Sequence, residues 1–332
     1  MTDAVTAARA LGFTELAAEG PALRERLGHF RKALGRQFVG KEDIVDLMTV
    51  CAIAGEPLLL VGPPGTAKSE LVLKFREALG VADEDAFEYM LTRFTEPAEV
   101  FGPLDLGELR GGRYLRRTRG KLPAARVAFL DEIFHASSAI LNALLTVLAE
   151  RRFFQDGAAV AVPLEVLFAA TNDLPVEDEL VALRDRFPLK ALSLPVHERR
   201  FGELVDAGLA GLADRELGRR PWAEGHATLA DVVKARRYLT WQMGRGETPD
   251  RERFFPEATF GELRRLLRTL AREEGVPVSD RRVVRLYRLI RARAWLLHGG
   301  AVEREDLLLC AHLGETRAQL ERLAERVPEL LG

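Results

Sequence analysis

The chain has 332 residues, a length that predicts two domains rather than a single core. Apolar residues make up 47% and charged residues 30%, and the formal net charge of −2 gives no general attraction to nucleic acid or to acidic membranes. No run of about 18 apolar residues and no secretory leader is present, so we expect no membrane span and a cytoplasmic location. The two cysteines, Cys51 and Cys310, are too far apart in sequence to form a metal-binding motif.

The first two-thirds of the chain alternates short apolar runs with helical patterns, which is typical of a parallel sheet wrapped by helices. Strands are predicted at 58–61, 87–91, 127–131, 166–171 and 192–196. Between the third and the fourth, residues 137–150 place leucines on one face of a helix. After residue 197 only helical patterns follow. We therefore predict an α/β domain over residues 1–197 and a helical domain over 198–332.

Residues 62–69, Gly-Pro-Pro-Gly-Thr-Ala-Lys-Ser, lie between the first predicted strand and a helix. Such a turn is typical of a phosphate-binding loop, because its backbone amides and the positive end of the helix dipole attract phosphate oxygens. Lys68 is expected to reach the β- and γ-phosphates, and the Ser69 hydroxyl to bind Mg²⁺. The general pattern has glycine before the lysine, and Ala67 is expected to be tolerated if its φ is negative. The alternative is a tight turn before a core helix.

Polar residues also end the third and fourth predicted strands. Asp131 and Glu132 follow an apolar run, which is the form of a Walker B motif. The aspartate would hold Mg²⁺ through water, and the glutamate would polarise the attacking water. Asn172 ends the following strand and is expected at the same edge of the sheet. Acidic strand ends and Asn-Asp turns are common by themselves, so their position after a phosphate loop is what favours a nucleotide site.

The segments "GPPGTAKS", "FLDEIFHASSAILNALLTVLAER", "AATNDLP", "LRDRF" and "VSDRRV" occur in the order of, and resemble, the MoxR family of AAA+ ATPases, most closely its RavA-like branch. Alanine before the lysine is usual in that group. The resemblance covers about residues 20–325. It implies an α/β fold: a P-loop AAA+ module with a five-stranded parallel sheet flanked by helices, and a smaller all-α lid domain.

The resemblance also implies roles for individual residues. Asn172 matches sensor 1, Arg186 matches the arginine finger that a neighbouring subunit receives, and Arg281 matches sensor 2 of the lid. Arg184 and Arg282 are the alternatives for the last two roles. The implied cofactors are ATP and Mg²⁺, with Ser69 and Asp131 as metal ligands and Glu132, Asn172 and Arg186 as catalytic residues. The implied nucleotide contacts are Val39, Gly40, Gly62, Pro63, Pro64, Gly65, Thr66, Ala67, Lys68, Ser69, Glu70, Asp131 and Arg281.

Two segments interrupt the alternation and are predicted as hairpins, at 105–123 with a Gly111-Gly112 turn and at 151–165 with an Asp156-Gly157 turn. Proteins of this branch are similar in having two such insertions. Between residues 106 and 121 the first carries six basic side chains and one acidic one. In a chain with 41 arginines and seven lysines this is either a solvated face or a substrate-facing loop.

The resemblance implies an ATPase that acts as a hexameric ring and remodels or matures a partner protein, often one with a von Willebrand factor A domain. A nucleic-acid-dependent motor is the alternative, and it is supported only by the basic segment 105–123. A third possibility is a small-molecule kinase or a GTPase. That class leaves the helical domain unexplained, and the guanine-reading Asn-Lys-x-Asp motif is absent after the later strands.

Overall fold

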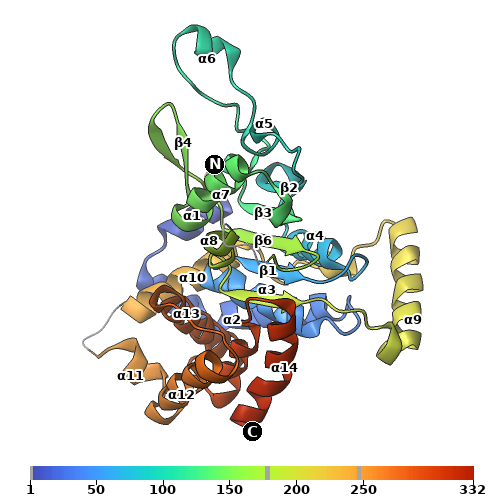
Figure 1. Ribbon diagram of the computed structural model, residues 1–332, viewed down its shortest axis with the longest axis vertical. Coiled ribbons are helices and arrows are strands. Elements are labelled where there is room, and N and C mark those ends of the chain that lie inside the picture. The colour runs from blue at the N-terminus through green and yellow to red at the C-terminus, as the bar shows by residue number, and fades with distance from the viewer. Residues whose placement is uncertain (1–2, 176–179, 245–247) are drawn as a thin grey trace.

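A five-stranded, entirely parallel sheet forms the centre of the molecule (Figure 1). The computed structural model describes residues 3–175, 180–244 and 248–332. The strand order is β2-β3-β6-β1-β7, which confirms the predicted α/β architecture. The bounds of the strands are β1 Leu58–Val61, β2 Ala86–Met90, β3 Val127–Asp131, β6 Val166–Thr171 and β7 Leu189–Leu192.

Both faces of the sheet are covered by helices, as expected for parallel strands. Along β1, Leu58 and Leu60 belong to one apolar core, and Leu59 and Val61 belong to another. The first core is closed by α2 (Phe13–Gly35), α3 (Glu42–Ala54) and α4 (Lys68–Ala78). The second is closed by α5 (Pro97–Phe101) and α7 (Ser138–Glu150). The period of two along the strand therefore separates the two helical layers.

Four of the five predicted strands are confirmed, with β2 displaced by one residue. The fifth prediction, 192–196, is wrong, because β7 ends at Leu192. Lys190 lies in the middle of β7 and is fully buried, so the strand lacks a continuous apolar run. Its ammonium group is paired with Glu315 at 3.0 Å, a partner 125 residues away in sequence. A charge compensated from so far along the chain is invisible to a local pattern.

The two predicted insertions differ in structure. Segment 151–165 is a hairpin of β4 (Arg152–Gln155) and β5 (Ala158–Ala161), and its Asp156-Gly157 turn has positive φ at both residues, as predicted. Segment 105–123 is not a simple hairpin with a turn at Gly111-Gly112. Asp105 accepts hydrogen bonds from two backbone amides and starts a short helix, α6 (Leu106–Arg110), and the chain returns through one bridge, Leu104 to Arg116.

The two insertions contact each other and project together from one end of the molecule (Figure 1). The amide of Tyr114 donates to Asp156 at 3.0 Å, and the amide of Arg116 donates to Gln155 at 2.7 Å. At their base the rings of Phe101 and Phe153 stack with centroids 5.4 Å apart. The first insertion is thus supported by the tip of the second.

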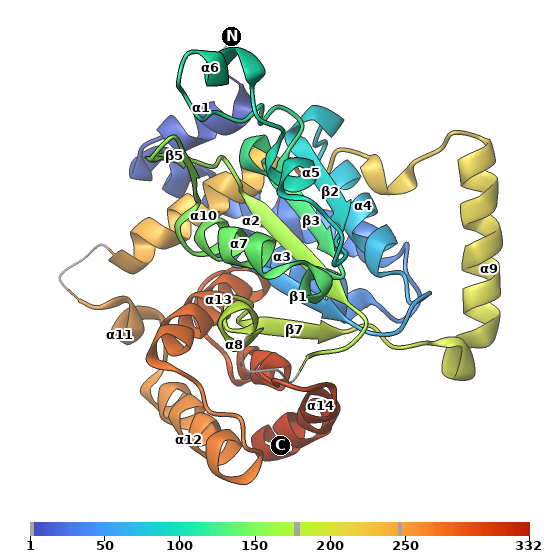
Figure 2. The same cartoon turned by 45° about the horizontal axis from the view of Figure 1, so that its top comes forward.

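Only helices follow β7 in the described chain. Figure 2 shows α9 (His197–Glu216) standing apart from the body, whereas α10 (Leu229–Gly244) returns to pack on α2. A separate group is formed by α12 (Glu257–Glu273), α13 (Asp280–His298), the 3₁₀ segment Arg304–His312 and α14 (Arg317–Leu331). The remaining helical elements are α1 Ala4–Ala10, α8 Val181–Arg184 and α11 Asp250–Phe254, with 3₁₀ turns at Asp83–Asp85, Leu122–Ala124, Ile133–His135 and Pro221–Ala223.

None of the helices in residues 3–175, 180–244 and 248–332 has the length and apolar content needed to cross a bilayer.

Candidate nucleotide site

The loop between β1 and α4 is held in place by backbone contacts that only glycine permits. A Cβ on Gly62 would lie 2.1 Å from the carbonyl oxygen of Ser193, so no side chain fits there. The hydroxyl of Ser193 donates to the carbonyl oxygen of Thr66 at 2.7 Å, and the Thr66 hydroxyl donates to that of Pro63 at 2.8 Å. These bonds tie the loop to the segment after β7 and shape its turn.

Ala67 departs from its expectation. Its φ is +67° and its ψ is +18°, so the negative φ under which its methyl group was expected to be tolerated does not occur. The left-handed conformation places Ala67 at the N-cap of α4 and costs a residue with a Cβ about 1 kcal/mol. In return, the backbone N–H groups of residues 65–69 have no acceptor within the described chain. Five free amides at the start of an 11-residue helix form a site suited to an anion.

Two lysines add positive charge at this loop, and neither has a carboxylate partner among the residues that the structure describes. Lys68 donates to the carbonyl oxygens of Gly62 and Pro63 and, at 3.2 Å, to the side-chain oxygen of Asn172. Burial lowers the pKa of Lys68. Burial, together with the charge of Lys68, lowers the pKa of Lys41 to about 8. Desolvated cations that repel each other favour a polyanionic ligand, which would stabilise their charged forms.

The predicted acidic and amide residues meet at the same edge. The Ser69 hydroxyl lies 3.3 Å from the carboxylate of Asp131, so the two proposed metal ligands are adjacent. Glu132 has a positive φ of 50°, and its carboxylate accepts a 3.4 Å hydrogen bond from the amide of Asn172. The ring of His135 approaches the same carboxylate to 3.4 Å, a contact that the sequence did not predict. The structure therefore brings the lysine, the acidic pair and the asparagine together.

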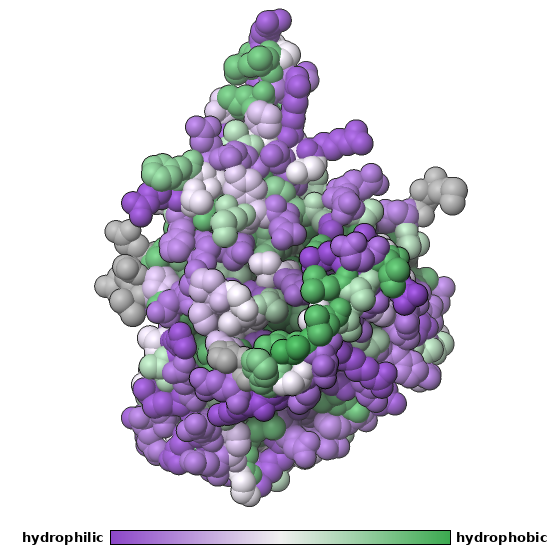
Figure 3. All heavy atoms as spheres, turned by 90° about the vertical axis from the view of Figure 1, so that its right-hand side faces the viewer, coloured by the Kyte–Doolittle hydropathy of each residue, from purple (hydrophilic) through white to green (hydrophobic). Residues whose placement is uncertain are grey.

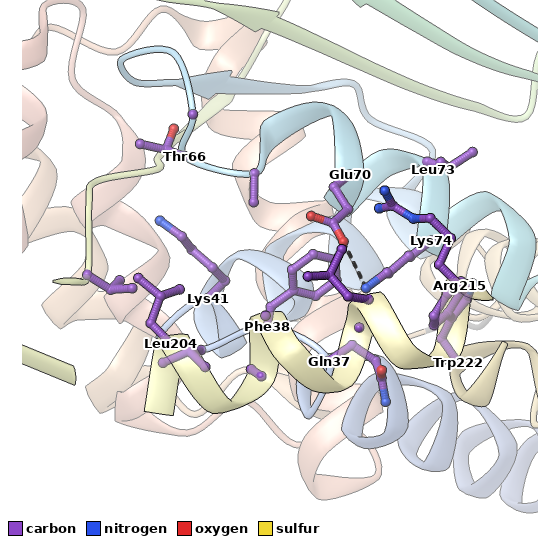
Figure 4. Close-up of a pocket in the computed structure, with 18 of the residues that line it drawn as sticks. Gln37, Phe38, Lys41, Thr66, Glu70, Leu73, Lys74, Leu204, Arg215 and Trp222 are labelled. Carbon is purple, nitrogen blue, oxygen red and sulfur yellow. Dashed lines mark ion pairs between the residues drawn. The ribbon is translucent and has the colours of Figure 1, made fainter. Parts of the chain in front are cut away.

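A pocket of about 570 Å³ opens beside this loop (Figure 4). Lys41 and Thr66 lie at one end, and Arg215 and Trp222 lie at the other. Its walls include Val39, the loop residues 65–67, Glu70 and the segment 194–196, and one side is formed by α9. Gly40 packs against Val196 of this lining, because a Cβ at Gly40 would lie 3.0 Å from a side-chain carbon of Val196. The size and the mixed lining suit a nucleotide.

The predicted finger and sensor 2 arginines lie elsewhere, beside one another. Arg186 and Arg281 both approach Asp185, at 3.6 Å and 4.0 Å, and neither is among the described residues that line the pocket. Burial and the charge of Arg281 lower the pKa of Arg186. Arg186 precedes β7, whose first residue, Leu189, pairs with Leu58 at the start of β1, whereas the phosphate loop follows Val61 at the end of β1. The arginine pair therefore forms a surface separate from the phosphate loop.

The two alternative arginines serve the fold instead. Arg184 is buried and donates to the carbonyl oxygen of Pro175. Arg282 is buried, donates to the carbonyl oxygens of Pro188 and Leu313, and pairs with Glu315. Since their guanidinium groups are occupied by these partners, Arg186 and Arg281 are the better candidates for contact with a ligand.

The residue that supports the backbone at Asp185 and Arg186 was not predicted from the sequence. Arg285 of α13 donates to the carbonyl oxygens of Asp185 and Arg186, at 3.0 and 2.6 Å. Its Nε also donates to the buried carboxylate of Glu56 at 2.6 Å. The partners lie about 100 to 230 positions away in the chain, so no local spacing could have revealed them.

The same module is found in known proteins. A family model described as the MoxR domain in the MoxR-vWA-beta-propeller ternary systems matches residues 25–224. The chain belongs to the MoxR family of AAA+ ATPases. A second model, an AAA lid domain, matches residues 258–325 and identifies the α12–α14 group as the lid. The resemblance seen in the sequence is thereby confirmed at the level of the family, and ATPase is the activity of that family.

Individual relatives agree with this assignment. An uncharacterized protein of Methanocaldococcus jannaschii is 31% identical over 290 residues, which cover 86% of this chain and 70% of that protein. Chaperone MoxR1 of Mycobacterium tuberculosis is 31% identical over 163 residues, 47% of this chain and 41% of MoxR1. A crystal structure of a Cytophaga hutchinsonii protein assigned as an ATPase superposes with a TM-score of 0.68 at 17% identity, over 96% of this chain and 98% of that one. This likeness shows the shared fold.

Proposed function

We propose that this MoxR-family protein hydrolyses ATP in a site completed by two copies of the chain. The observation that carries the proposal is the division of its cations between two surfaces. Lys68 and the free amides of residues 65–69 lie at the pocket, whereas Arg186 and Arg281 lie together outside it. The pocket is also lined by Arg215, Arg219 and Arg220, but Arg215 lies at the end away from Thr66 (Figure 4), so a neighbour would supply the arginine that acts on a γ-phosphate at the loop.

The residues at the loop fit ATP and Mg²⁺. Free amides and a lysine without a carboxylate partner suit the phosphates, and the oxygens of Ser69 and Asp131 are the hard ligands that Mg²⁺ prefers. The bound ion would neutralise charge on the phosphate oxygens. Glu132 would orient and polarise the attacking water. Asn172 would position the Glu132 carboxylate through its backbone N–H, and its side chain would contact the water or the γ-phosphate.

Charge that spreads over the phosphoryl oxygens in the transition state requires further cations. Arg186 is the proposed finger because its guanidinium makes only a 3.6 Å ion pair with Asp185 within the described chain. Arg281, whose side chain is 63% exposed, is proposed to act beside it and on the same neighbouring nucleotide. The sequence-based expectation named Arg281 as sensor 2 without saying which copy's nucleotide it contacts.

A ring, most simply a hexamer, is the proposed assembly, and remodelling or maturation of a partner protein is the proposed role. The matching family model describes MoxR domains that function with vWA and β-propeller components, which supports a client with a von Willebrand factor A domain. The chaperone name of the mycobacterial relative supports a remodelling role. Placement in the RavA-like branch and a domain boundary at residue 197 are finer parts of the same proposal.

The structure adds little support for the alternative function, a nucleic-acid-dependent motor. In the basic segment, Arg113 pairs with Glu108, and Arg117 pairs with Asp105 at 2.9 Å. Lys121 donates to a backbone carbonyl. Ion pairs within the segment leave Arg110 and Arg119 as its exposed arginines without a partner in the described chain, a modest charge for binding a phosphate backbone.

The dependence of ATP hydrolysis on assembly tests the proposal. Specific activity should rise with protein concentration until the ring is complete and then become constant, with the midpoint equal to that of assembly in sedimentation velocity. Activity that is independent of concentration while the protein is monomeric would show that one chain contains the whole site. Loss of activity on removal of Mg²⁺ by a chelator, restored by added Mg²⁺, is expected as well.

A further inference from the structure

Helix α9 carries an apolar stripe that the described part of the chain leaves exposed. Phe201, Val205 and Leu209 are 67%, 42% and 61% exposed, and with Leu204 and Leu212 they recur at the spacing of one helical face. None of the described side chains of α9 is buried. In Figure 3, which faces this side of the molecule, apolar residues gather in a band over α9. Amphipathic helices normally bury such a face, so α9 lacks its partner here.

A second uncovered apolar surface lies on the lid. A groove of about 450 Å³ between α12 and the start of α13 is lined by apolar side chains and two arginines. Its lining residues are Phe260, Leu263, Leu267, Ala271, Pro277, Val278, Val283, Arg264 and Arg268. Both arginines are exposed and have no ion pair within the described chain. The groove therefore has an apolar floor and a positive rim.

The two surfaces match in length and in charge. The stripe of α9 extends from Phe201 to Leu212 and the groove from Phe260 to Ala271, eleven steps of about 1.5 Å in each helix. Helix α9 has five acidic and three basic side chains, whereas the charged lining of the groove is entirely basic. A helix with an apolar face and an acidic excess is the expected occupant of a groove with this floor and rim.

The two surfaces cannot meet within one chain as it is folded. In both Figure 1 and Figure 2, α9 lies to the right of the sheet, and α12 lies at the lower left of the view. Short segments join α9 to β7 and to the 3₁₀ turn at Pro221–Ala223, which is tied to α4 through a 2.7 Å bond from Trp222 to Glu77. Two different surfaces that are complementary but cannot meet within one chain can bind each other in a head-to-tail contact between two copies.

We propose that α9 of each copy docks into the α12–α13 groove of the next copy. This proposal rests on the proposed function in one respect, since both require copies of the chain to associate. In addition, it specifies which two surfaces meet. Because Leu204 and Leu212 of α9 also line the nucleotide pocket, the contact fixes the wall of that pocket when the neighbour is present.

Two variants separate the two halves of the contact. Val205→Asp/Leu209→Asp places charge on the stripe at positions outside the nucleotide pocket, and Arg264→Glu/Arg268→Glu reverses the rim of the groove. All four side chains are exposed, so both variants should fold. The matched control is Arg265→Glu/Arg272→Glu, the same charge change on exposed positions of α12 outside the groove.

Association is measured by sedimentation velocity with a non-hydrolysable ATP analogue. We expect self-association at least about thirtyfold weaker for the α9 variant, at least about tenfold weaker at low salt for the groove variant, and unchanged for the control. An equal mixture of the two variants should associate at a concentration where each alone is monomeric. In that mixture the intact α9 of the groove variant meets the intact groove of the α9 variant.

The other outcomes overturn the proposal. An α9 variant that assembles like wild type shows that the stripe is not an interface between copies. A defect in the α9 variant alone, with a normal groove variant, shows that α9 contacts a different surface or another α9. No association in the mixture excludes the head-to-tail pairing. If wild type and variants assemble alike and hydrolyse ATP in proportion to assembly, this contact is wrong and the proposed shared site stands.

Discussion

Two surfaces of the molecule differ in how their charged groups are paired. One is the phosphate loop, residues 62–69, and the other is the arginine face, which contains Arg184, Arg186, Arg281 and Arg282. At the loop, Lys68 and Lys41 have no carboxylate partner, and five backbone amides have no acceptor, among the described residues. At the arginine face, Arg282 and Arg184 are buried against main-chain carbonyls, whereas the ion pairs that the structure describes for Arg186 and Arg281 are those of 3.6 and 4.0 Å to Asp185. Both surfaces therefore contain positive groups without a strong partner in the described chain: lysines and backbone amides at the loop, and guanidinium groups at the arginine face.

This difference teaches how to separate functional from structural cations in a chain with 41 arginines. Burial alone does not distinguish them, because Lys68 and Arg282 are both buried. What distinguishes them is whether the charge has a permanent partner. Arg282 has a carboxylate and two carbonyl groups as partners, whereas the partners of Lys68 in the described part of the chain are carbonyl groups and one amide oxygen. A buried cation without a carboxylate is unstable until an anion binds.

The largest effect is expected at the loop. Lys68→Ala should abolish nucleotide binding, and Glu132→Gln should bind ATP but hydrolyse it at least about a hundredfold more slowly. The reason is that one side chain holds phosphate and the other activates water. Fluorescent-nucleotide titration and phosphate release measure the two steps, with Lys234→Ala, paired with Glu19 away from the pocket, as the control. A Glu132→Gln protein with normal turnover would refute the assignment.

A comparably large loss, with normal binding, is expected at the arginine face. Arg186→Ala should bind ATP and lower turnover about a thousandfold, the range observed for arginine fingers. Mixing it with Lys68→Ala protein should restore part of the hydrolysis, because one kind of interface then combines an intact loop with an intact finger. If mixed assemblies form and no activity returns, the arginine acts within its own chain.

Adjacent arginines of α13 should separate stability from activity. Arg282→Ala leaves two carbonyl groups without their donor and leaves the half-buried Glu315 with Lys190 as its remaining partner, so it should cost about 1–3 kcal/mol of unfolding free energy. Arg281→Ala should change stability by less than about 0.5 kcal/mol yet lower ATP turnover about tenfold or more. Denaturant unfolding and ATPase assays on the same samples make the comparison. The reverse result would exchange the two roles.

The basic insertion is expected to affect clients rather than chemistry. Arg110→Ser/Arg119→Ser should leave basal hydrolysis within about threefold, because neither side chain belongs to the loop or to the arginine face. Client-stimulated activity should fall more than in Arg113→Ser/Arg117→Ser, whose arginines are already paired with Glu108 and Asp105. Salt-dependent binding of a single-stranded oligonucleotide by wild type, lost in the first variant, would instead favour the nucleic-acid motor.

The smallest expected effect concerns the backbone of the loop. Ala67→Gly should raise the unfolding free energy by up to about 1 kcal/mol, because glycine adopts φ +67° without a steric cost. Gly80→Ala, at φ +66° with open space around it, should lower it by a similar amount and serves as the matched control. A decrease in stability for Ala67→Gly would show that the methyl group makes a contact worth more than the strain.

Several features of the protein were determined by the sequence alone, because they depend on neighbours in the chain. A strand, a glycine-rich turn and a helix define the phosphate loop within about 20 residues, and strands β1, β3 and β6 were located to the residue. The Asp156-Gly157 turn was likewise encoded by two adjacent residues with a preference for positive φ. Parallel strands then place Lys68, Asp131 and Asn172 at one edge as a consequence of topology.

Only the tertiary structure could decide the features that depend on distant partners. Strand β7 was misplaced because Glu315, 125 residues away, compensates its buried lysine. The choice of Arg186 over Arg184 and of Arg281 over Arg282 depends on carbonyl groups of Pro175, Pro188 and Leu313. The same holds for α9, whose pattern predicts an amphipathic helix anywhere in the fold, while its isolation depends on where the chain leaves the sheet. Sequence periodicity specifies which face of an element is apolar, but the surface that covers this face is set by packing over the whole chain.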